Sequence, residues 1–463
     1  MGFVPLHCHS VFSFHAGVCS IKDLVKQSVA FGFKALALTD TDRMSGLIPF
    51  YLECRKAGIK PILGVELTDP QDPEAHVVLL ARNAEGYGDL CEIITQRHLD
   101  AGFSYTKVFA KPWPNLFFTT SFPHHLELLA STPNRGHLYG ELINNSERTR
   151  QRCKRLEKTA KALKIPLIVS NDSFFLHRRD WDIHKILVAI GLASTLSRLK
   201  PGEFASERAY FKSAEEIEKS FCYHKEAIRN TQRLADRCDV SLKLNEWIMP
   251  KVTVPDGHTP DTYLRKLALE GLETCYGGTE AYEQAREIQE MELEVISKLG
   301  YPSYFLIVKD VRDWANETFK GLCRRPKDCS ILRGSAANSI TFYNIGVSDL
   351  DPIRYDLYFQ RFLNEDRASP PDADLDFGWD ERDRVIDYVM DKWGEDRVAI
   401  TCTTNHFRWR AAFRETAKVF GYSEEQVTRI MDSQRTRTRK LEDREIRHIL
   451  ALSDRIRGKP RFL

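Results

Sequence analysis

The sequence predicts an α/β protein in which a barrel of alternating strands and helices is followed by helical segments and a second, smaller α/β region. Three observations support this class. Strand-length apolar runs alternate with helical stretches from Val4 to about Asp172, a pattern typical of a parallel sheet or closed barrel. Prolines and glycines cluster at 250–260, as at a domain boundary. An apolar strand and an acidic, alternating strand follow at 331–333 and 371–377.

Composition limits the functional classes. The chain has 463 residues, of which 42% are hydrophobic and 29% charged, which excludes a disordered tail. Apolar runs are far shorter than the ~20 residues of a membrane helix, so we expect no membrane partner. Lys and Arg number 67 against 65 for Asp and Glu, so any nucleic-acid surface must be local. Eleven scattered cysteines and no secretory signal pattern predict a reduced, cytoplasmic protein.

The barrel region divides into strands and helices in a regular order. Ser20 caps the first helix, which Gly32 closes, and Gly58 follows the second, which ends near Lys56. Basic residues dominate the last helix, at 146–164. The expected strands are 4–9, 34–39, 61–67, 75–81, 115–120 and 166–169. Because parallel strands present their carboxyl ends on one side of a barrel, functional residues are expected there.

Imidazoles and carboxylates fall at these strand ends. His7 and His9 project from the same face of one strand because side chains alternate along it. The other candidates are Asp40, Glu66, His76 and Asp172. Such ligands converging at one end of a barrel would suit Zn, Mn or Fe. The alternative is that each is an ordinary polar residue at the end of a strand.

The first region resembles the PHP (polymerase and histidinol phosphatase) domain. The resemblance rests on four motifs: His7-Cys8-His9-Ser10, Leu38-Thr39-Asp40, Gly64-Val65-Glu66 and Val169-Ser170-Asn171-Asp172. It implies a distorted (β/α)7 barrel over 1–176 whose clustered His, Asp and Glu residues hold up to three metals for phosphoester hydrolysis.

Several positions depart from the family pattern. Thr41 and Phe174 stand where the motifs usually have histidine, and Ala16 replaces an acidic ligand, with His15 beside it as a substitute. A further ligand is expected at 117–126, where the candidates are His124 and His125. We therefore expect a degenerate metal site, holding Zn²⁺ or Mn²⁺ if any metal, that keeps the fold without robust hydrolysis.

A helical linker is expected over 177–250. Beyond it, one helix carries Ile288 to Leu299 and ends at Gly300, and Ser303 is expected to cap the next. A short apolar strand then leads through Arg333, Gly334 and Ser335 into a helix that ends near Gly346. A glycine there admits close approach of a ligand, a helix start offers N–H groups to an anion, and an arginine binds phosphate. The alternative is a structural turn.

The acidic strand places Asp372, Asp374 and Asp376 on one face and apolar residues on the other. Like charges along one strand face repel, and a divalent cation removes that cost. Mg²⁺ binds such carboxylates together with substrate phosphates, and two Mg²⁺ ions catalyse in-line phosphoryl displacement. The alternative is a solvated acidic face. A helix capped by Asp380 and ended by Gly394 is expected next.

These motifs together resemble the bacterial family C DNA polymerases, the DNA polymerase III alpha subunits, in which a PHP domain also comes first. The matching segments occur in the family's order: Tyr304-Phe305-Leu306-Ile307-Val308, Arg333-Gly334-Ser335-Ala336-Ala337-Asn338-Ser339, Asp351-Pro352, Phe359-Gln360-Arg361-Phe362-Leu363-Asn364 and Pro371-Asp372-Ala373-Asp374-Leu375-Asp376-Phe377. Asn338-Ser339 and Pro370-Pro371-Asp372 are closer to the error-prone branch than to the main replicase, and both branches stay open.

The resemblance implies a nucleotidyltransferase-like palm over 251–403 and the start of a helical thumb over 404–463. It assigns Gly334 and Ser335 to the incoming triphosphate and Asp374 and Asp376 to catalytic Mg²⁺. Charge and proximity add triphosphate contacts at Arg333, Arg361 and Arg367. Gln360 replaces the usual Glu, with little catalytic consequence expected.

Basic residues on the last helices suit the backbone of duplex DNA, or form a solvated helix face; they are Arg408, Arg410, Arg414, Arg435, Arg437, Arg439 and Lys440. The family places a third metal-binding aspartate further downstream, so we expect a truncated form that needs missing parts for activity.

Three functions therefore remain open. The first is a DNA-directed DNA polymerase that acts on primer-template DNA and dNTPs, helped by other replication or repair subunits or by a downstream polymerase half. The second is a PHP-type phosphoesterase or 3′-5′ exonuclease, and the third is an inactive DNA- or replisome-binding remnant.

Overall fold

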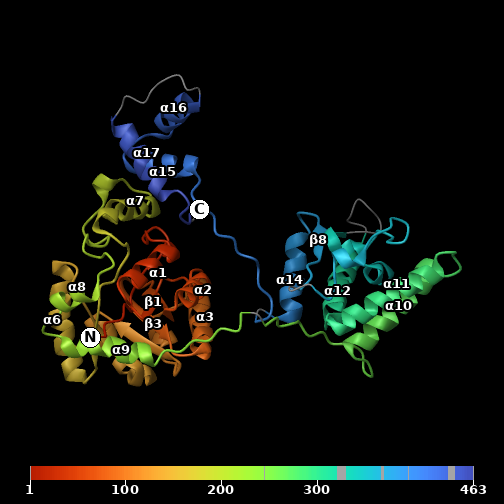
Figure 1. Ribbon diagram of the computed structural model, residues 1–463, viewed down its shortest axis with the longest axis horizontal. Helices are drawn as coiled ribbons and strands as arrows, with labels where there is room; N and C mark the ends of the chain where they lie inside the picture. Colours follow the sequence, from red (N-terminus) through yellow and green to blue (C-terminus); the bar gives the residue numbers. More distant parts are fainter. Residues whose placement is uncertain are drawn as a thin grey trace. The chain divides into compact units, whose positions relative to one another are not determined.

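The computed structural model describes residues 2–461 except 245, 321–329, 367–369, 395 and 436–443. The chain forms two compact units, the first made of Met1–Leu242 with Thr403–Leu463 and the second of Lys243–Cys402. Figure 1 colours them along the sequence. Within the described residues, no helix is both long and apolar enough to cross a membrane.

A curled six-stranded sheet forms the centre of the first unit, which confirms the predicted α/β barrel class. Its strands follow the chain in order: β1 (Ala35–Leu38), β2 (Lys60–Asp69), β3 (Asp72–Ala81), β4 (Leu116–Thr120), β5 (Leu138–Ile143) and β6 (Leu167–Ser170). β1 and β2 are parallel, as are β4, β5 and β6, whereas β3 runs antiparallel to both of its neighbours. The sheet is therefore mixed, and an all-parallel arrangement is wrong, because the short turn after Asp69 reverses the chain directly into β3.

The predicted first strand closes the barrel without pairing regularly enough to be a strand. Its backbone accepts hydrogen bonds from β1, at Ala37 N to Pro5 O and at Thr39 N to Cys8 O, each 2.9 Å. On its other side, His9 N donates to Ser173 O at 2.9 Å, just beyond β6. Residues 4–9 therefore lie between the first and last strands of the sheet, with His7 and His9 at the point of closure.

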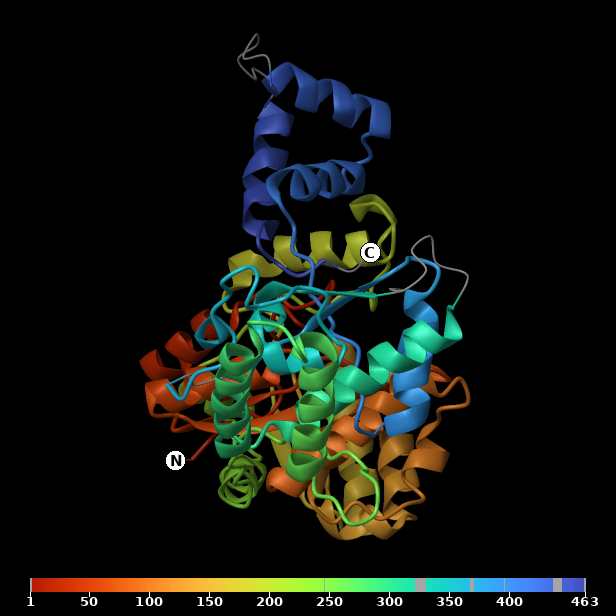
Figure 2. The ribbon, with the colours of Figure 1, turned by 90° about the vertical axis from the view of Figure 1, so that its right-hand side faces the viewer.

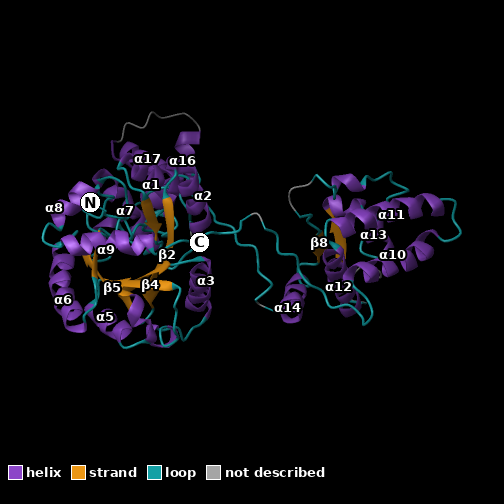
Figure 3. Ribbon diagram, turned by 60° about the horizontal axis from the view of Figure 1, so that its bottom comes forward, coloured by secondary structure: helices purple, strands orange, loops and turns teal. Residues whose placement is uncertain are grey.

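Helices cover the outside of this sheet, as Figure 3 shows. They are α1 (Ile21–Ala30), α2 (Leu47–Ala57), α3 (Ala84–Leu99), α4 (Tyr105–Val108), α5 (Pro123–Ala130), α6 (Glu147–Leu163), α8 (Ala214–Ser220) and α9 (Lys225–Asp236). Ser20 caps α1 by accepting from Asp23 N, and Gly58 ends α2 at φ +70°, both as predicted. The predicted helix at 146–164 is α6. β5 and the helices α3 and α5 are not among the elements predicted from the sequence.

The last described helices are α15 (Trp409–Val419), α16 (Glu424–Arg435) and α17 (Arg444–Ile456). α15 and α17 pack on α7 (Trp181–Gly191) of the same unit, and α16 packs on α15. Ile183 and Ile186 of α7 share one apolar core with Ala412 of α15 and Ile456 of α17. Arg455 also donates to Asp180 Oδ1 at 2.6 Å. Figure 2 shows these helices, in blue, beside the olive α7. The predicted basic helices are therefore anchored to the unit that carries the barrel.

The described residues of the second unit are mainly helical and include one strand pair. They form α10 (Pro260–Tyr276), α11 (Tyr282–Lys298), α12 (Pro302–Thr318), α13 (Ile340–Asn344), α14 (Arg382–Trp393), β7 (Ser330–Arg333) and β8 (Asp374–Phe377). β7 and β8 are antiparallel, with Arg333 opposite Asp374. Trp314 of α12 stacks on Tyr388 of α14 with ring centroids 4.2 Å apart.

Three local expectations in this unit are corrected. The residue before α12 is Tyr301 rather than Ser303, because Pro302 takes the first helical position. The residue before α14 is Glu381 rather than Asp380. No α-helix starts at Gly334: residues Gly334–Asn338 form a 3₁₀ turn, η4, and α13 begins at Ile340 after its cap Ser339.

Candidate metal centre and candidate nucleotide site

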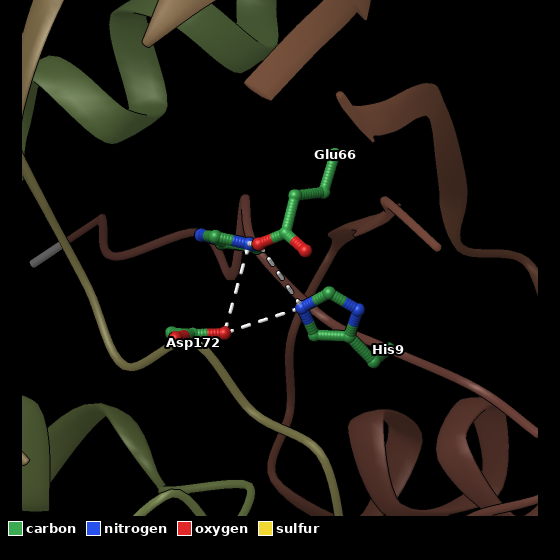
Figure 4. A group of neighbouring side chains, drawn as sticks. His9, Glu66 and Asp172 are labelled. Atoms are coloured by element: carbon green, nitrogen blue, oxygen red, sulfur yellow. Dashed lines mark hydrogen bonds and ion pairs between the residues drawn. The ribbon is translucent and has the colours of Figure 1, made fainter. Parts of the chain in front are cut away.

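Four side chains from distant parts of the chain meet at the closure of the barrel: His7, His9, Glu66 and Asp172. Figure 4 labels three of them, His9, Glu66 and Asp172, whose side chains point toward one another. His7 Nε2 lies 3.1 Å from Glu66 Oε2 and 3.6 Å from Asp172 Oδ1. His9 Nε2 lies 3.8 Å and 3.2 Å from the same two oxygens. The ligand atoms of a tetrahedral Zn²⁺ site, with bonds of about 2.0–2.1 Å, lie roughly 3.3 Å apart, so this spacing suits such an ion.

Hydrogen bonds orient both imidazoles with Nε2 toward the centre. Glu141 Oε1 lies 2.9 Å from His7 Nδ1, so this nitrogen carries the proton and donates it. Ser13 donates its hydroxyl proton to Asp40 Oδ1 at 2.7 Å, and its oxygen therefore accepts from His9 Nδ1 at 2.9 Å. Metal-binding histidines show this pattern, with one nitrogen on the metal and the other held by a carboxylate or hydroxyl.

The charges at this site favour a cation. Burial alone would raise the pKa values of Glu66, Glu141 and Asp172, but the neighbouring imidazoles outweigh it and hold all three below their ordinary values. Burial alone would lower the pKa of His7, but Glu141 and Asp172 raise it well above its ordinary value. Ionised carboxylates thus outnumber the protonated His7, and a divalent ion replacing that proton would balance them.

Two predicted ligands lie beside this group rather than within it. Asp40 accepts hydrogen bonds of 2.7 Å from Ser10 N, Ser10 Oγ and Ser13 Oγ, which places it behind His9. His76, within the antiparallel β3, contacts the same Glu66 oxygen through Nδ1 at 3.2 Å. Burial lowers the pKa of His76, which keeps its ring neutral.

The three departures from the family pattern have different surroundings. Thr41 donates a hydrogen bond to Glu66 Oε1 at 2.8 Å, so it positions the candidate ligand Glu66. The histidine that the family usually has at this position would itself be a ligand. Phe174 stacks on His9 with centroids 4.0 Å apart and planes within 7°. His15 has a positive φ of 62° and a buried Nε2 without a hydrogen-bond partner among the described residues. The four-residue group contains none of these three residues.

Sequence reasoning missed the orienting groups, Glu141 and Ser13. Glu141 is fully buried on β5 and accepts from Ser170 at 2.5 Å as well as from His7. The signal was present in Leu138-Tyr139-Gly140-Glu141-Leu142-Ile143, an apolar stretch with one acid, but Gly140 weakens a strand pattern. His124 and His125 lie outside the four-residue group and form a second one with Asp72.

The second unit brings the predicted triphosphate and Mg²⁺ residues onto neighbouring strands. Arg333 Nε lies 2.5 Å from Asp376 Oδ2, and both side chains are exposed. Burial alternates along β8, with Asp374 and Asp376 exposed and Leu375 and Phe377 half-buried, as the sequence pattern predicts. Gly334 has a φ of +74°, a conformation that glycine adopts without strain. A side chain there would lie 3.5 Å from Asp374 Oδ2.

The remaining residues predicted to contact the triphosphate are Ser335, Arg361 and Arg367. Ser335 is the second residue of the 3₁₀ turn η4, directly after Gly334. Arg361 ends the turn η5 (Phe359–Arg361), which packs on η4, and its side chain is exposed. Gln360 lies on the same turn. Arg367 lies outside the described residues.

A buried acid supports this loop from behind. Glu292 of α11 is fully buried and accepts from Ser339 Oγ at 2.7 Å and from Ile340 N and Thr341 N at 2.9 Å each. Burial raises its pKa to about 7, although the hydrogen bonds from Thr341, Ser339 and Ile340 act in the opposite direction. Glu292 therefore caps α13 and fixes the segment that follows the Gly334 turn.

The basic helices carry fewer free charges than the sequence suggests. Arg408 and Arg410 are exposed, with Arg410 5.7 Å from the ring centre of Trp409. Arg414 forms an ion pair with Glu424 at 2.5 Å. Arg437, Arg439 and Lys440 lie outside the described residues, as does the side chain of Arg435.

Both the barrel region and the region of the β7–β8 pair match known protein families. Residues 5–168 match the PHP domain, and residues 262–461 match the family described as the bacterial DNA polymerase III alpha NTPase domain. DNA polymerase III subunit alpha of Pseudomonas fluorescens is 34% identical over 458 residues, covering 91% of this chain and 38% of that protein. The Escherichia coli K12 subunit alpha is 32% identical, covering 92% and 39%. The error-prone DNA polymerase of Symbiobacterium thermophilum is also 32% identical, covering 92% and 41%.

This chain thus spans about two fifths of the length of these relatives. The similarity covers both units, and both family domains occur in the order that the motifs predict. The chain therefore belongs to the family of bacterial DNA polymerase III alpha subunits and matches the amino-terminal portion of its relatives.

Proposed function

We propose that the β7–β8 pair of this chain serves template-directed nucleotidyl transfer, with dNTPs and primer-template DNA as substrates. One observation carries the proposal: antiparallel pairing sets Arg333 and Gly334, from one motif, directly beside Asp374 and Asp376, from another motif more than thirty residues away. A phosphate-binding arginine and turn beside two exposed carboxylates form one half of a two-metal nucleotidyltransferase site.

Asp374 and Asp376 are the groups that would hold Mg²⁺, which, when bound, neutralises the triphosphate and activates the primer 3′-hydroxyl. Arg333 forms an ion pair with Asp376. A cation held by Asp374 and Asp376 would leave the guanidinium of Arg333 free to contact the triphosphate oxygens. The backbone at Gly334 lies close to Asp374 and lacks a side chain that would hinder the phosphates.

The relatives are more than twice as long as this chain, and the family resemblance puts the third carboxylate further downstream. We therefore propose a downstream polymerase polypeptide as a partner and the cytoplasm as the location. Primer extension by the purified chain, alone and with that polypeptide, tests the proposal. We expect extension that needs Mg²⁺, disappears in Asp374→Ala and survives in Asp387→Asn, an exposed acid on α14. Extension that survives Asp374→Ala would refute the role of the pair.

A second function, phosphoester hydrolysis in the barrel, is favoured by the oriented His7, His9, Glu66 and Asp172 group. Zn²⁺ or Mn²⁺ would, when bound there, polarise a phosphate and lower the pKa of a bound water. Thr41 and Phe174 remove two of the family's ligands, so the expected activity is weak. Hydrolysis of a generic phosphodiester or of a DNA 3′ end that needs Zn²⁺ or Mn²⁺, is lost in His9→Gln and is kept in Asp374→Ala would support it. If neither activity is found, DNA binding that weakens as salt rises would support the third function, that of a DNA-binding module without catalytic activity.

A further inference from the structure

A second group of metal-ligand side chains lies outside both sites described above. It consists of Asp72 at the start of β3 and the neighbouring His124 and His125 in the first turn of α5. His124 Nε2 lies 2.9 Å from Asp72 Oδ2, and His125 Nε2 lies 3.8 Å from the same oxygen. One ligand atom from each residue falls within 4.8 Å of the others.

We propose that Asp72, His124 and His125 form a separate binding site for a divalent transition-metal ion, of which Zn²⁺ is the probe. Two imidazoles and one carboxylate are donors that Zn²⁺ accepts, whereas Mg²⁺ and Ca²⁺ prefer oxygen alone. The two distances from Asp72 lie on either side of the roughly 3.3 Å that separates ligand atoms in a tetrahedral Zn²⁺ site. Small rotations of exposed side chains would therefore complete the geometry, and water would take the fourth position.

The surroundings hold one ligand still and leave the other two free to adjust. The His125 side chain is only 6% exposed and its ring meets Tyr105 edge-on, with centroids 4.8 Å apart. His124 and Asp72 are 57% and 41% exposed, so an ion can reach them from solvent. A simple surface hydrogen bond between Asp72 and His124 would account for the position of His124. It would not account for the position of His125, whose Nε2 lies 3.8 Å from the same Asp72 oxygen, which is beyond hydrogen-bond distance.

This site is distinct from the barrel centre. Phe122 lies between the two, with its ring 5.2 Å from that of His76 and 5.9 Å from that of His125. The ligands come from the start of β3 and the start of α5, so a bound ion would tie these two segments together. The inference does not depend on the polymerase function proposed above, because none of its residues belongs to the second unit.

Metal binding by the full chain tests the proposal. The chain is stripped with a chelator and titrated with Zn²⁺ against a chromophoric competitor, and with Co²⁺ to record the absorption of a four-coordinate site. We expect His124→Ala and Asp72→Asn each to bind one equivalent fewer than the unmodified chain, or to bind that equivalent at least tenfold more weakly. His7→Gln would leave this equivalent in place, and His177→Ala, which changes an exposed histidine outside both groups, would lose nothing.

Unchanged stoichiometry and affinity in His124→Ala and Asp72→Asn would overturn the proposal. Loss in His124→Ala alone would also overturn it, because the carboxylate would then not be a ligand. Far-UV circular dichroism checks that the variants fold. His125→Asn adds a third test at the buried position, where loss of the same equivalent is expected.

Discussion

Two residues outside the four-residue group, Glu141 and Ser13, set the orientation of the imidazoles at the barrel centre. Glu141 and Ser13 each accept a hydrogen bond from Nδ1 of one histidine, which directs Nε2 of His7 and His9 toward Glu66 and Asp172. Without them both rings could rotate or adopt the other tautomer. The candidate metal site thus depends on the residues that orient the candidate ligands as much as on those ligands.

The first prediction concerns Glu141. Glu141→Gln keeps an oxygen near His7 Nδ1 but removes the charge that orients and polarises the ring, so we expect Zn²⁺ to bind the barrel centre about 10–100-fold more weakly. Competition titration in an Asp72→Asn background measures Zn²⁺ binding at the barrel centre alone, because that substitution removes the second proposed site. Glu85→Gln, an exposed acid at the start of α3, is the control and should change nothing. An affinity unchanged by Glu141→Gln would show that this carboxylate does not orient the ligand.

The second prediction restores a lost ligand. Phe174 stacks directly on His9, so a histidine at this position would bring its ring beside the metal ligands. We expect Phe174→His to increase the amount of Zn²⁺ or Mn²⁺ bound at the barrel centre and to raise metal-dependent phosphodiester hydrolysis. Phe174→Leu is the control for loss of stacking and should raise neither. Equal behaviour of the two variants would mean that this position does not limit the site.

At the scale of single elements, the loop after β7 depends on a buried carboxylate. Glu292 has a pKa of about 7, above its ordinary value, because burial disfavours its charge. Between about pH 4.5 and 7 the folded state keeps a proton that the unfolded state has released. The free energy of unfolding of the second unit therefore falls as pH rises through this window, by at most about 3 kcal/mol.

Glu292→Gln should remove this component of the pH dependence, and Glu294→Gln, an exposed neighbour on α11, should keep it. Hydrogen exchange of the α13 amides at pH 5 and pH 8, corrected for intrinsic rates, provides the measurement. The protection should be greater at pH 5 in the unmodified chain and equal at both pH values in Glu292→Gln. A pH dependence that persists in Glu292→Gln would contradict the assignment.

The elements show where sequence reasoning succeeds and where it stops. Capping residues and apolar runs predicted α1, β1, α2, β2 and α6 because these signals are local. The reading missed β5, since Gly140 and Glu141 interrupt its apolar pattern, and Glu141 was missed with it. The direction of β3 depends on the short turn near Asp69, and the position of Asp40 behind Ser13 depends on tertiary contacts. Motif spacing predicted the candidate ligands, and the fold shows which residues orient them.

At the scale of the whole molecule, charged residues are concentrated in separate regions although the net charge is close to zero. The chain is nearly neutral, with 67 basic and 65 acidic residues. The carboxylates of Glu66, Glu141 and Asp172 gather in the barrel, two more lie on β8, and exposed Arg408 and Arg410 lie at the start of α15. Arg414 is already paired with Glu424, so the described DNA-binding candidates that remain are Arg408 and Arg410.

A salt titration separates DNA contacts from a solvated face. If Arg408 and Arg410 each contact a phosphate, Arg408→Ala and Arg410→Ala should each make the slope of log K against log salt for duplex DNA less steep by about 0.9. Arg229→Ala, which removes an exposed arginine on α9, should leave the slope unchanged. Slopes that do not change in Arg408→Ala and Arg410→Ala would assign these residues to a solvated helix face.

The proposed site for Mg²⁺ and a nucleoside triphosphate consists of Arg333, Gly334, Asp374 and Asp376. Equilibrium dialysis of the full chain with radiolabelled dATP, with and without Mg²⁺, measures binding there without requiring turnover. We predict Mg²⁺-dependent binding that is lost in Asp374→Asn with Asp376→Asn, weakened at least tenfold in Arg333→Ala, and unchanged in Asp387→Asn. Binding that is indifferent to Mg²⁺, or that the paired aspartate substitution leaves intact, would contradict it.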